Sequence, residues 1–140
     1  RVAGRFQRIA RHPEIVLDVA HNPEAARALA ATLHAHPVAG RTWAVIGLLA
    51  DKDVEGVLAP LLAHFDGWFT CTPDSPRALA SSTLAEAIRE LRGTGTVTPC
   101  DTPQRALDMA QKQAADDDRI VAFGSFYTVA AVLNYARSHE

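Results

Sequence analysis

The 140-residue sequence predicts an α/β fold in which helices cover a mostly parallel sheet. Two observations support this prediction. Short apolar runs, several of them rich in β-branched residues, alternate along the chain with amphipathic segments of ~10 to 15 residues. Proline or a capping residue marks most of the junctions. Such alternation is typical of parallel strands joined by right-handed crossovers, and the length fits one domain.

The chain opens with two short apolar-rich runs, 6–10 and 14–20, separated by His12-Pro13. We interpret them as a hairpin-like pair. The second run contains Ile15-Val16-Leu17, and consecutive apolar residues of this kind are typical of a strand buried on both faces. The pair is therefore expected to add one antiparallel edge strand to the parallel sheet.

A helix is predicted next, because Asn22 is a suitable N-cap and Pro23 suits the first helical position. Pro37 marks its end. The unit then repeats with a strand at 43–46 and a helix that begins after Asp53. The predicted apolar stripe of this second helix comprises Val54, Val57, Leu58, Leu61, Leu62 and Phe65.

A third unit consists of a strand at 68–71, a proline-containing loop at 72–80 and a helix. Thr83 and Glu86 have the spacing of a capping box, and Gly93 is expected to close the helix.

The last two strands are expected at 96–100 and 119–123. Thr102-Pro103 repeats the signal of a cap followed by proline, which predicts a helix at 104–115. The final helix is expected at 129–136 after a Gly-Ser turn.

Composition narrows the class of protein. Hydrophobic residues make up 48% of the chain and charged residues 21%, and the net charge is −2. No basic surplus favours nucleic acid, and no polybasic run favours a membrane surface. The sequence has no signal peptide and no apolar run of transmembrane length. Cys71 and Cys100 are too few and too far apart for a disulfide framework or a zinc site, so we expect them to be small core residues. A cytoplasmic monomer is the expectation.

The sequence begins at Arg1 rather than at methionine. We therefore expect a further part of the protein upstream.

Four loops collect unusual polar residues at places where predicted strands end. Ligands of open parallel sheets bind at the carboxyl ends of the strands, so the four loops are expected to lie on one edge of the sheet. The loops are Asp18-Val19-Ala20-His21-Asn22, Asp51-Lys52-Asp53, Asp74-Ser75-Pro76-Arg77 and Gly124-Ser125-Phe126-Tyr127.

Each candidate side chain has a functional and a structural interpretation. Asp18 could accept from a ribose hydroxyl or hold a metal-bound water, or it could cap the following loop. His21 precedes the N-cap and is expected to point into the crevice. Lys52 could hold a phosphate or carboxylate, or it could be a solvated residue at a helix start. Arg77 offers a fork for a carboxylate, or it lies free on the surface. Ser125 follows a glycine in a turn that suits an anion.

Several motifs of nucleotide chemistry are absent. The sequence contains no G-x-G-x-x-G after the first strand and no G-x-x-x-x-G-K-[ST] phosphate loop. Ser125 is not within a G-x-S-x-G elbow, which disfavours serine hydrolysis. An enzyme that uses a nucleotide needs a phosphate loop or an equivalent, and this chain contains none. The residues therefore indicate an incomplete enzyme.

The most specific segment is Leu17-Asp18-Val19-Ala20-His21-Asn22-Pro23 after a buried strand. Four more segments accompany it in order, namely Gly4-Arg5-Phe6-Gln7, Val45-Ile46-Gly47 leading to Asp51-Lys52-Asp53, Ser75-Pro76-Arg77-Ala78, and 123–129. In these residues the chain resembles the C-terminal domain of the bacterial folylpolyglutamate synthase/dihydrofolate synthase family, within the Mur ligase superfamily. The resemblance extends over nearly all 140 positions.

The resemblance implies a three-layer Rossmann-like domain with a six-stranded, mostly parallel sheet and one antiparallel edge strand. In such ligases ATP phosphorylates a substrate carboxylate, and the amine of an incoming amino acid attacks the acyl phosphate. Residues 1–140 would form the glutamate-ligase domain. An N-terminal ATPase domain, absent from this chain, would supply the phosphate loop and most ligands of Mg²⁺. The partners implied are that domain, ATP, L-glutamate and dihydropteroate or folate, and the isolated domain is expected to be inactive.

The resemblance also implies roles for single residues. Arg5 matches an arginine near the hinge that reaches the ATP phosphates. Asp18 matches the position that holds the ribose, and Asn22 is both cap and wall of the nucleotide site. His21, which faces the reacting phosphate region, and Lys52 are the catalytic candidates. Three further residues, Ser125, Arg77 and Tyr127, are expected to bind glutamate, and Tyr127 stands where the family also has histidine.

Two alternatives remain open at this point. One is the C-terminal domain of a Mur-type ligase whose acceptor is a cell-wall precursor. The other is a freestanding small-molecule-binding module with a flavodoxin-like sheet, which would bind its ligand tightly without a second domain.

Overall fold

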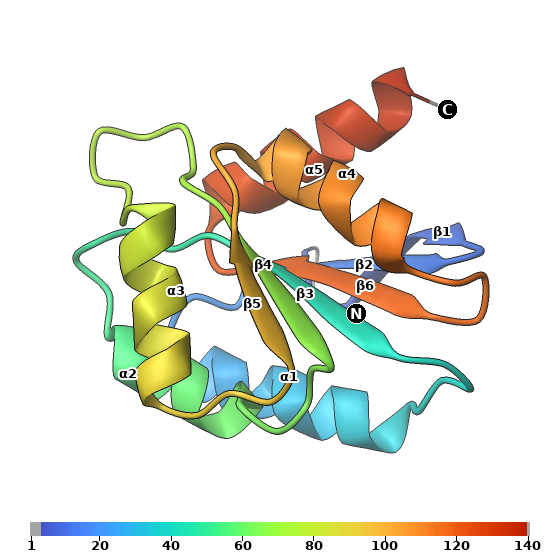
Figure 1. Cartoon of the computed structure of the whole chain (residues 1–140), viewed down its shortest axis with the longest axis horizontal. Coiled ribbons are helices and arrows are strands. Elements are labelled where there is room, and N and C mark those ends of the chain that lie inside the picture. The colour runs from blue at the N-terminus through green and yellow to red at the C-terminus, as the bar shows by residue number, and fades with distance from the viewer. Residues whose placement is uncertain (1–3, 140) are drawn as a thin grey trace.

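A six-stranded sheet forms the centre of the computed structural model, which describes residues 4–139 (Figure 1). Its order is β1-β2-β6-β3-β4-β5. Neighbouring strands pair in parallel, except that β1 and β2 are antiparallel. The predicted fold class and its antiparallel edge strand are thus confirmed. The strands are β1 (Gln7–Arg11), β2 (Glu14–Asp18), β3 (Thr42–Ile46), β4 (Gly67–Thr70), β5 (Thr96–Pro99) and β6 (Arg119–Phe123).

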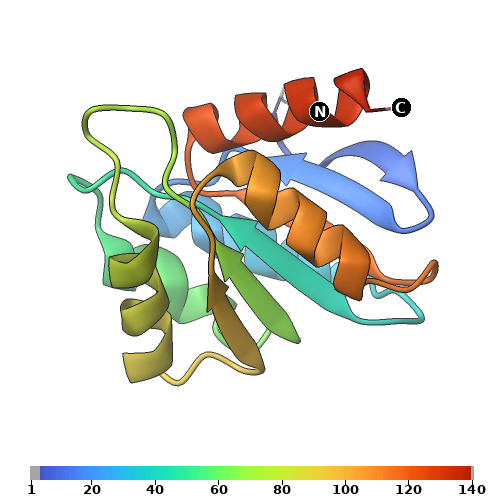
Figure 2. The same cartoon turned by 45° about the horizontal axis from the view of Figure 1, so that its top comes forward.

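Helices cover both faces of the sheet and give three layers (Figures 1 and 2). One face is covered by α1, α2 and α3, and the other by α4 and α5. Each face has its own apolar core, and the central strands contribute alternate residues to the two cores. The helices are α1 (Pro23–Ala35), α2 (Val54–Leu58), the 3₁₀ turn η1 (Ala59–Leu61), α3 (Ser81–Glu90), α4 (Pro103–Gln113) and α5 (Phe126–Ser138).

Strand β2, next to the edge strand β1, shows why the sequence predicted this arrangement. Val16 packs into the core beneath α1, whereas Ile15 and Leu17 pack into the core beneath α4 and α5. Both sides of the strand are buried, so every position of the apolar run needs an apolar side chain.

The helix expected to run from Val54 through Phe65 is shorter than predicted. It ends at Leu58 and continues only as the 3₁₀ turn Ala59–Leu61. Pro60 has no amide hydrogen to donate within the helix, which explains the change. The apolar stripe still faces the core, because Val57, Leu58, Leu61 and Phe65 are buried.

The predicted capping box of Thr83 and Glu86 is wrong. Helix α3 already begins at Ser81, and Ala80 at its N-cap makes no side-chain hydrogen bond. Instead, the hydroxyl of Thr72 accepts from the Ser81 amide at 2.9 Å. Thr72, nine positions upstream, therefore caps the helix. The sequence next to the helix start does not reveal this contact.

Two other helix ends also differ. Gly93 was expected to close α3, but Arg92 adopts the left-handed conformation with φ 61°. The Gly93 amide then donates to the Ile88 carbonyl at 2.9 Å. This is the hydrogen bond of a Schellman motif that spans six residues. The last helix begins at Phe126 rather than 129, because Ser125 caps it.

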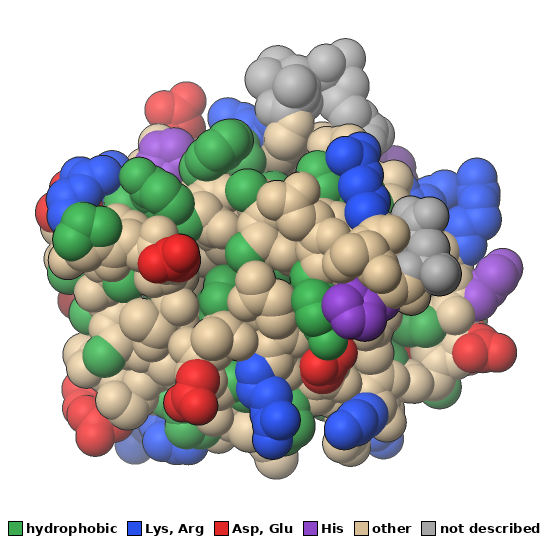
Figure 3. Space-filling model, turned by 90° about the horizontal axis from the view of Figure 1, so that it is seen from above, with side chains coloured by type: hydrophobic (Ala, Val, Ile, Leu, Met, Phe, Trp, Pro, Cys, Tyr) green, Lys and Arg blue, Asp and Glu red, His purple; other side chains and the backbone are tan. Residues whose placement is uncertain are grey.

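The two cysteines are core residues, as expected. Cys71 and Cys100 are buried and unpaired, and burial raises the pKa of the Cys71 thiol to about 12. None of the described helices is long and apolar enough to cross a membrane. Over the α4 and α5 face, basic and acidic side chains of the described residues lie scattered among uncharged surface (Figure 3).

Candidate functional site

The four polar loops leave the sheet at the same edge, because β2, β3, β4 and β6 run parallel. The loops after β3 and β4 lie side by side (Figure 2). Backbone hydrogen bonds join them, from the Ala50 amide to the Arg77 carbonyl at 2.8 Å and from the Leu79 amide to the Leu48 carbonyl at 2.9 Å. Their spacing is therefore set by the backbone and not by flexible side chains.

A pocket of about 200 Å³ lies at this edge and receives residues from all four loops. The predicted convergence of the loops is confirmed. Five of the predicted side chains line the pocket, namely His21, Lys52, Arg77, Ser125 and Tyr127. Leu49, Gly124 and Phe126 complete the lining.

His21 is oriented by its own loop. Its Nδ1 lies 2.8 Å from the Val19 carbonyl oxygen. A carbonyl can only accept, so Nδ1 must carry the hydrogen. In the neutral ring, Nε2 is then the atom with the free lone pair. This tautomer suits a group that accepts a proton from a ligand.

The Ser125 hydroxyl is turned inward, although it lines the pocket. It accepts from the Thr128 amide at 3.1 Å and lies 2.9 Å from Thr128 Oγ1. Because Thr128 Oγ1 gives its hydrogen to the Gly47 carbonyl, Ser125 must donate in that second contact. Ser125 therefore fixes the start of α5, whose first-turn amides, those of Phe126 and Tyr127, have no intrahelical acceptor and suit an anion.

Gly124 allows β6 to reach this position beside β3. Its φ is +115°, and a Cβ there would lie 2.4 Å from the Gly47 carbonyl oxygen. Any side chain would push the start of α5 away from the loop after β3.

Lys52 and Arg77 differ in whether their charges are paired with a carboxylate. Arg77 Nη1 lies 3.2 Å from Asp51 Oδ2, and both side chains are more than half exposed. Asp53 caps α2 through a 3.0 Å hydrogen bond from the Gly56 amide. Lys52 forms no ion pair among residues 4–139, so its charge is available. The cations and the α5 N-terminus make the pocket suited to an anion.

Asp18 lies outside the lining and bonds to the backbone. One carboxylate oxygen accepts from the Ala20 amide at 2.9 Å and the other from the Phe6 amide at 3.0 Å. The Val19 amide donates to the Gly4 carbonyl at 2.8 Å. Asp18 thus fastens the segment before β1 to the loop after β2. Burial raises the pKa of this carboxyl, while the two amide hydrogen bonds and the charge of Arg5 oppose the rise.

The other two predicted nucleotide residues lie in the same region and not in the pocket lining. Arg5 is exposed in the segment that Asp18 fastens. Asn22 is the N-cap of α1, as predicted, and accepts from the Ala25 amide at 2.8 Å. The described residues contain no group of three or more His, Cys, Asp or Glu side chains arranged to hold a metal ion.

Comparison with protein families matches residues 4–126 to the family described as "Mur ligase, glutamate ligase domain". The chain belongs to this family. The predicted resemblance is thereby confirmed, and the six-stranded sheet of this glutamate ligase domain agrees with that assignment.

Known relatives of the domain are longer proteins. "Dihydrofolate synthase/folylpolyglutamate synthase" of Escherichia coli is 38% identical over 130 residues, which are 93% of this chain and 29% of the relative. The structure "E.coli FolC in complex with DHPP and ADP" superposes with a TM-score of 0.88 at 37% identity, over 99% of this chain and 32% of that one. Another structure, of a bifunctional folylpolyglutamate synthase/dihydrofolate synthase "with Mn, AMPPNP and L-Glutamate bound", has a TM-score of 0.84 at 36% identity and covers 100% and 32%. The chain spans about 30% of the length of these proteins.

Proposed function

We propose that this domain is the glutamate-binding part of an ATP-dependent ligase that joins L-glutamate to dihydropteroate, to folates, or to both. The observation that supports this most directly is the meeting of Lys52, Arg77 and the α5 N-terminus around one pocket. Its volume of about 200 Å³ equals roughly seven waters, which is on the scale of an amino acid rather than a nucleotide. The names and bound ligands of the relatives point to the same substrates.

The chemistry of the pocket suits an amino acid with two carboxylates. Lys52, Arg77 and the first-turn amides of α5 would hold the carboxylates by charge-assisted hydrogen bonds. The nucleophile is the glutamate amine, which must lose a proton as it attacks the acyl phosphate. The C–N bond forms at the acyl carbon, and the C–O bond to phosphate breaks. His21 Nε2 would accept the proton, and Tyr127 would form part of the wall of the glutamate pocket.

Ser125 acts in this proposal as a positioning residue and not as a donor to glutamate, because its hydrogen is directed to Thr128. Arg5, Asp18 and Asn22 remain the proposed nucleotide side of the site. Each Asp18 oxygen has a second lone pair for a hydroxyl donor, although the residue itself is only 4% exposed. Domain closure would exclude the water that hydrolyses an acyl phosphate.

The rest of the ligase is proposed to lie in an N-terminal domain of a longer protein. That domain would supply the phosphate loop and most Mg²⁺ ligands, since the described residues contain no cluster fit for the metal. We propose a cytoplasmic, monomeric enzyme. A cell-wall acceptor is not favoured, because the relatives bear folate names.

The test uses the longer protein that contains this domain. Lys52→Met and Arg77→Met should each raise KM for L-glutamate by roughly 10- to 100-fold, the effect of losing one charge-assisted hydrogen bond. The KM for ATP should change less than threefold. Lys112→Met removes an exposed cation of α4 and serves as the matched control.

Steady-state kinetics with dihydropteroate, tetrahydrofolate and a muramyl substrate would identify the acceptor. An equal rise of both KM values in the two variants would contradict the assignment of this pocket to glutamate. Full ligase activity of the 140-residue chain alone would contradict the proposed division between domains.

A further inference from the structure

A second and larger hollow lies away from the candidate site. It occupies about 690 Å³ between β1, the start of β2 and the C-terminal end of α1. Arg119, which lines it, is the first residue of β6, whereas Ser125 of the candidate site lies beyond the last residue of the same strand. A strand of this length spans roughly 16 Å. The two sites are therefore at opposite ends of β6.

The charges that line this hollow do not balance. Arg8 Nε lies 3.0 Å from Glu14 Oε2, and Arg119 Nη1 lies 3.9 Å from Glu14 Oε1. Two guanidinium groups thus share one carboxylate. Glu14 is the only acidic residue among the described residues that line the hollow. One positive charge is left without a counterpart.

Burying the charge of Arg119 costs more free energy than burying the other charges of this network, because Arg119 is only 3% exposed. The guanidinium donates to the His36 carbonyl, and a longer 3.4 Å contact joins it to the Thr42 hydroxyl. Its Nε is buried and has no hydrogen-bond partner among residues 4–139. A buried charge is tolerated when it is paired and hydrogen-bonded. Burial lowers the pKa of Arg119, and the charge of Glu14 opposes this.

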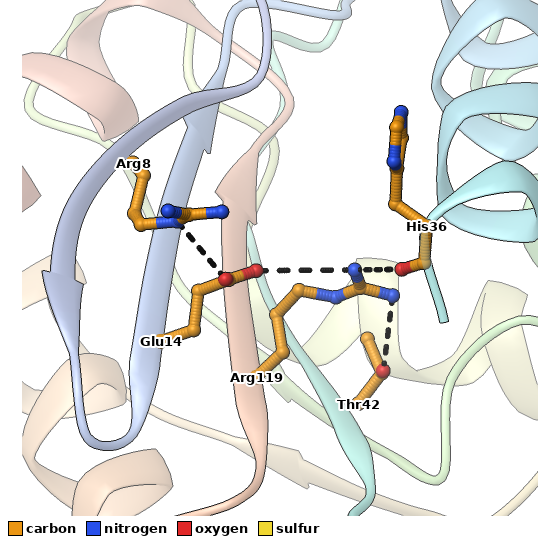
Figure 4. A network of polar contacts seen from close by, with 5 residues as sticks. All are labelled: Arg8, Glu14, His36, Thr42 and Arg119. Atoms are coloured by element: carbon orange, nitrogen blue, oxygen red, sulfur yellow. Dashed lines mark hydrogen bonds and ion pairs between the residues drawn. The ribbon is translucent and has the colours of Figure 1, made fainter. Parts of the chain in front are cut away.

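The side chains around Arg119 fix its position at the edge of the hollow. In Figure 4 the guanidinium groups of Arg8 and Arg119 lie on the two sides of Glu14, and His36 lies beyond Arg119. The Phe6 ring lies 5.8 Å from the Arg119 guanidinium carbon and supports it as a cation–π partner. The terminal nitrogens of Arg8 have no partner among the described residues, and the side chain is about half exposed.

We propose that this hollow binds a small organic anion, whose carboxylate or phosphate group lies against the terminal nitrogens of Arg8, next to the net positive charge that Arg8 and Arg119 leave around Glu14. Guanidinium groups match the planar geometry of both anionic groups. The volume is within the range of small-molecule sites, roughly 300–1,000 Å³, so the hollow is large enough for a small organic molecule. The proposal depends on these charges alone and does not require the ligase function.

The test follows the side-chain Nε–Hε signals of Arg8 and Arg119 by NMR in the 140-residue chain. Acetate and benzoate probe a carboxylate, and inorganic phosphate and AMP probe a phosphate, all at constant ionic strength set with NaCl. We expect saturable shifts of both signals with one of the two chemistries, and tighter binding of its organic member. Shifts that rise linearly with every probe, as with chloride, would overturn the proposal.

Two variants locate the binding. Arg8→Gln should weaken the anion at least tenfold, whereas Arg11→Gln, an exposed arginine of the same strand outside the hollow, should leave its affinity unchanged. Lys52→Met should also leave it unchanged, because Lys52 lies in the other pocket. Unaltered binding in Arg8→Gln, or loss of binding in Lys52→Met, would show that the anion binds elsewhere.

Discussion

Asp118 joins the amino ends of neighbouring strands through one side chain. Its carboxylate accepts from the Arg41 amide at 2.8 Å, the Trp43 indole at 3.0 Å and the Ala115 amide at 2.9 Å. Asp118 is 5% exposed and Trp43 is 4% exposed, so the indole in particular has little access to water as a substitute. Burial raises the pKa of this carboxyl, but the hydrogen bonds and the Arg41 charge together lower it below the usual value.

Asp118→Asn is predicted to destabilise the fold by about 2–4 kcal/mol at pH 7, because an amide nitrogen replaces one accepting oxygen and the donors that face it lose their partner. The lowered pKa means that Asp118 stabilises the fold above its unfolded pKa of about 3.9. This contribution is lost as the pH falls through the folded-state pKa. Urea unfolding should therefore show a smaller difference between wild type and variant at pH 3 than at pH 7.

Asp116→Asn provides the control, since Asp116 is exposed in the same loop and should change stability by less than about 0.5 kcal/mol. A difference between wild type and Asp118→Asn that stayed constant from pH 7 to pH 3 would exclude the electrostatic explanation.

At the scale of single residues, the sequence predicted which side chains gather but not how they point. Lys52, Arg77 and His21 follow predicted strands, and parallel pairing alone brings such positions together. The direction of the Ser125 hydroxyl depends on Gly47, 78 positions earlier in the chain. Arg119 was not singled out as a binding residue. In the sequence, the only local feature of Arg119 is that it follows Asp118 and directly precedes the apolar run at 120–123.

At the scale of elements, two helix starts were predicted from a capping residue followed by proline. Asn22 and Thr102 each accept from the amide three positions ahead. Ser125 does the same for α5, but no proline follows it, and that helix was expected to begin three residues later. The start of α3 was not predictable, because its amide bonds to Thr72 across a loop. A cap from the neighbouring residue depends only on local geometry. The start of α3 depends instead on the path of the loop after β4, which brings Thr72 to the Ser81 amide.

The N-cap of α1 gives a prediction at this scale. Asn22→Ala should cost about 1 kcal/mol, because the Ala25 amide loses its acceptor, and Asn22→Asp should retain most of the stability. Urea unfolding of the 140-residue chain measures both. Arg27→Ala, an exposed change in the same helix, is the comparison and should be nearly neutral. If Asn22→Ala were as stable as Arg27→Ala, the cap would have no energetic role.

At the scale of the whole molecule, strand position sets local stability. β6 pairs on both sides with β2 and β3, and its residues are buried. β5 pairs only with β4, and its residues are exposed or half-buried. Local opening therefore needs less free energy at β5 than at β6.

Native-state hydrogen exchange checks this difference. Amides of Ile120–Ala122 should exchange only through global unfolding, and those of Thr96–Thr98 at least tenfold faster. Equal protection of the two strands would mean that the sheet opens as one unit.

The sequence by itself determined the α/β class, the six strands, most helix starts and the loops that hold the candidate site. These features depend on periodicity and on neighbours within a few residues. Only the tertiary structure decided that four loops form one pocket, that Ser125 turns inward, and that Arg8 and Arg119 share Glu14. Each of these needs contacts between residues distant in the chain, whose geometry is set by strand order and packing on both faces of the sheet.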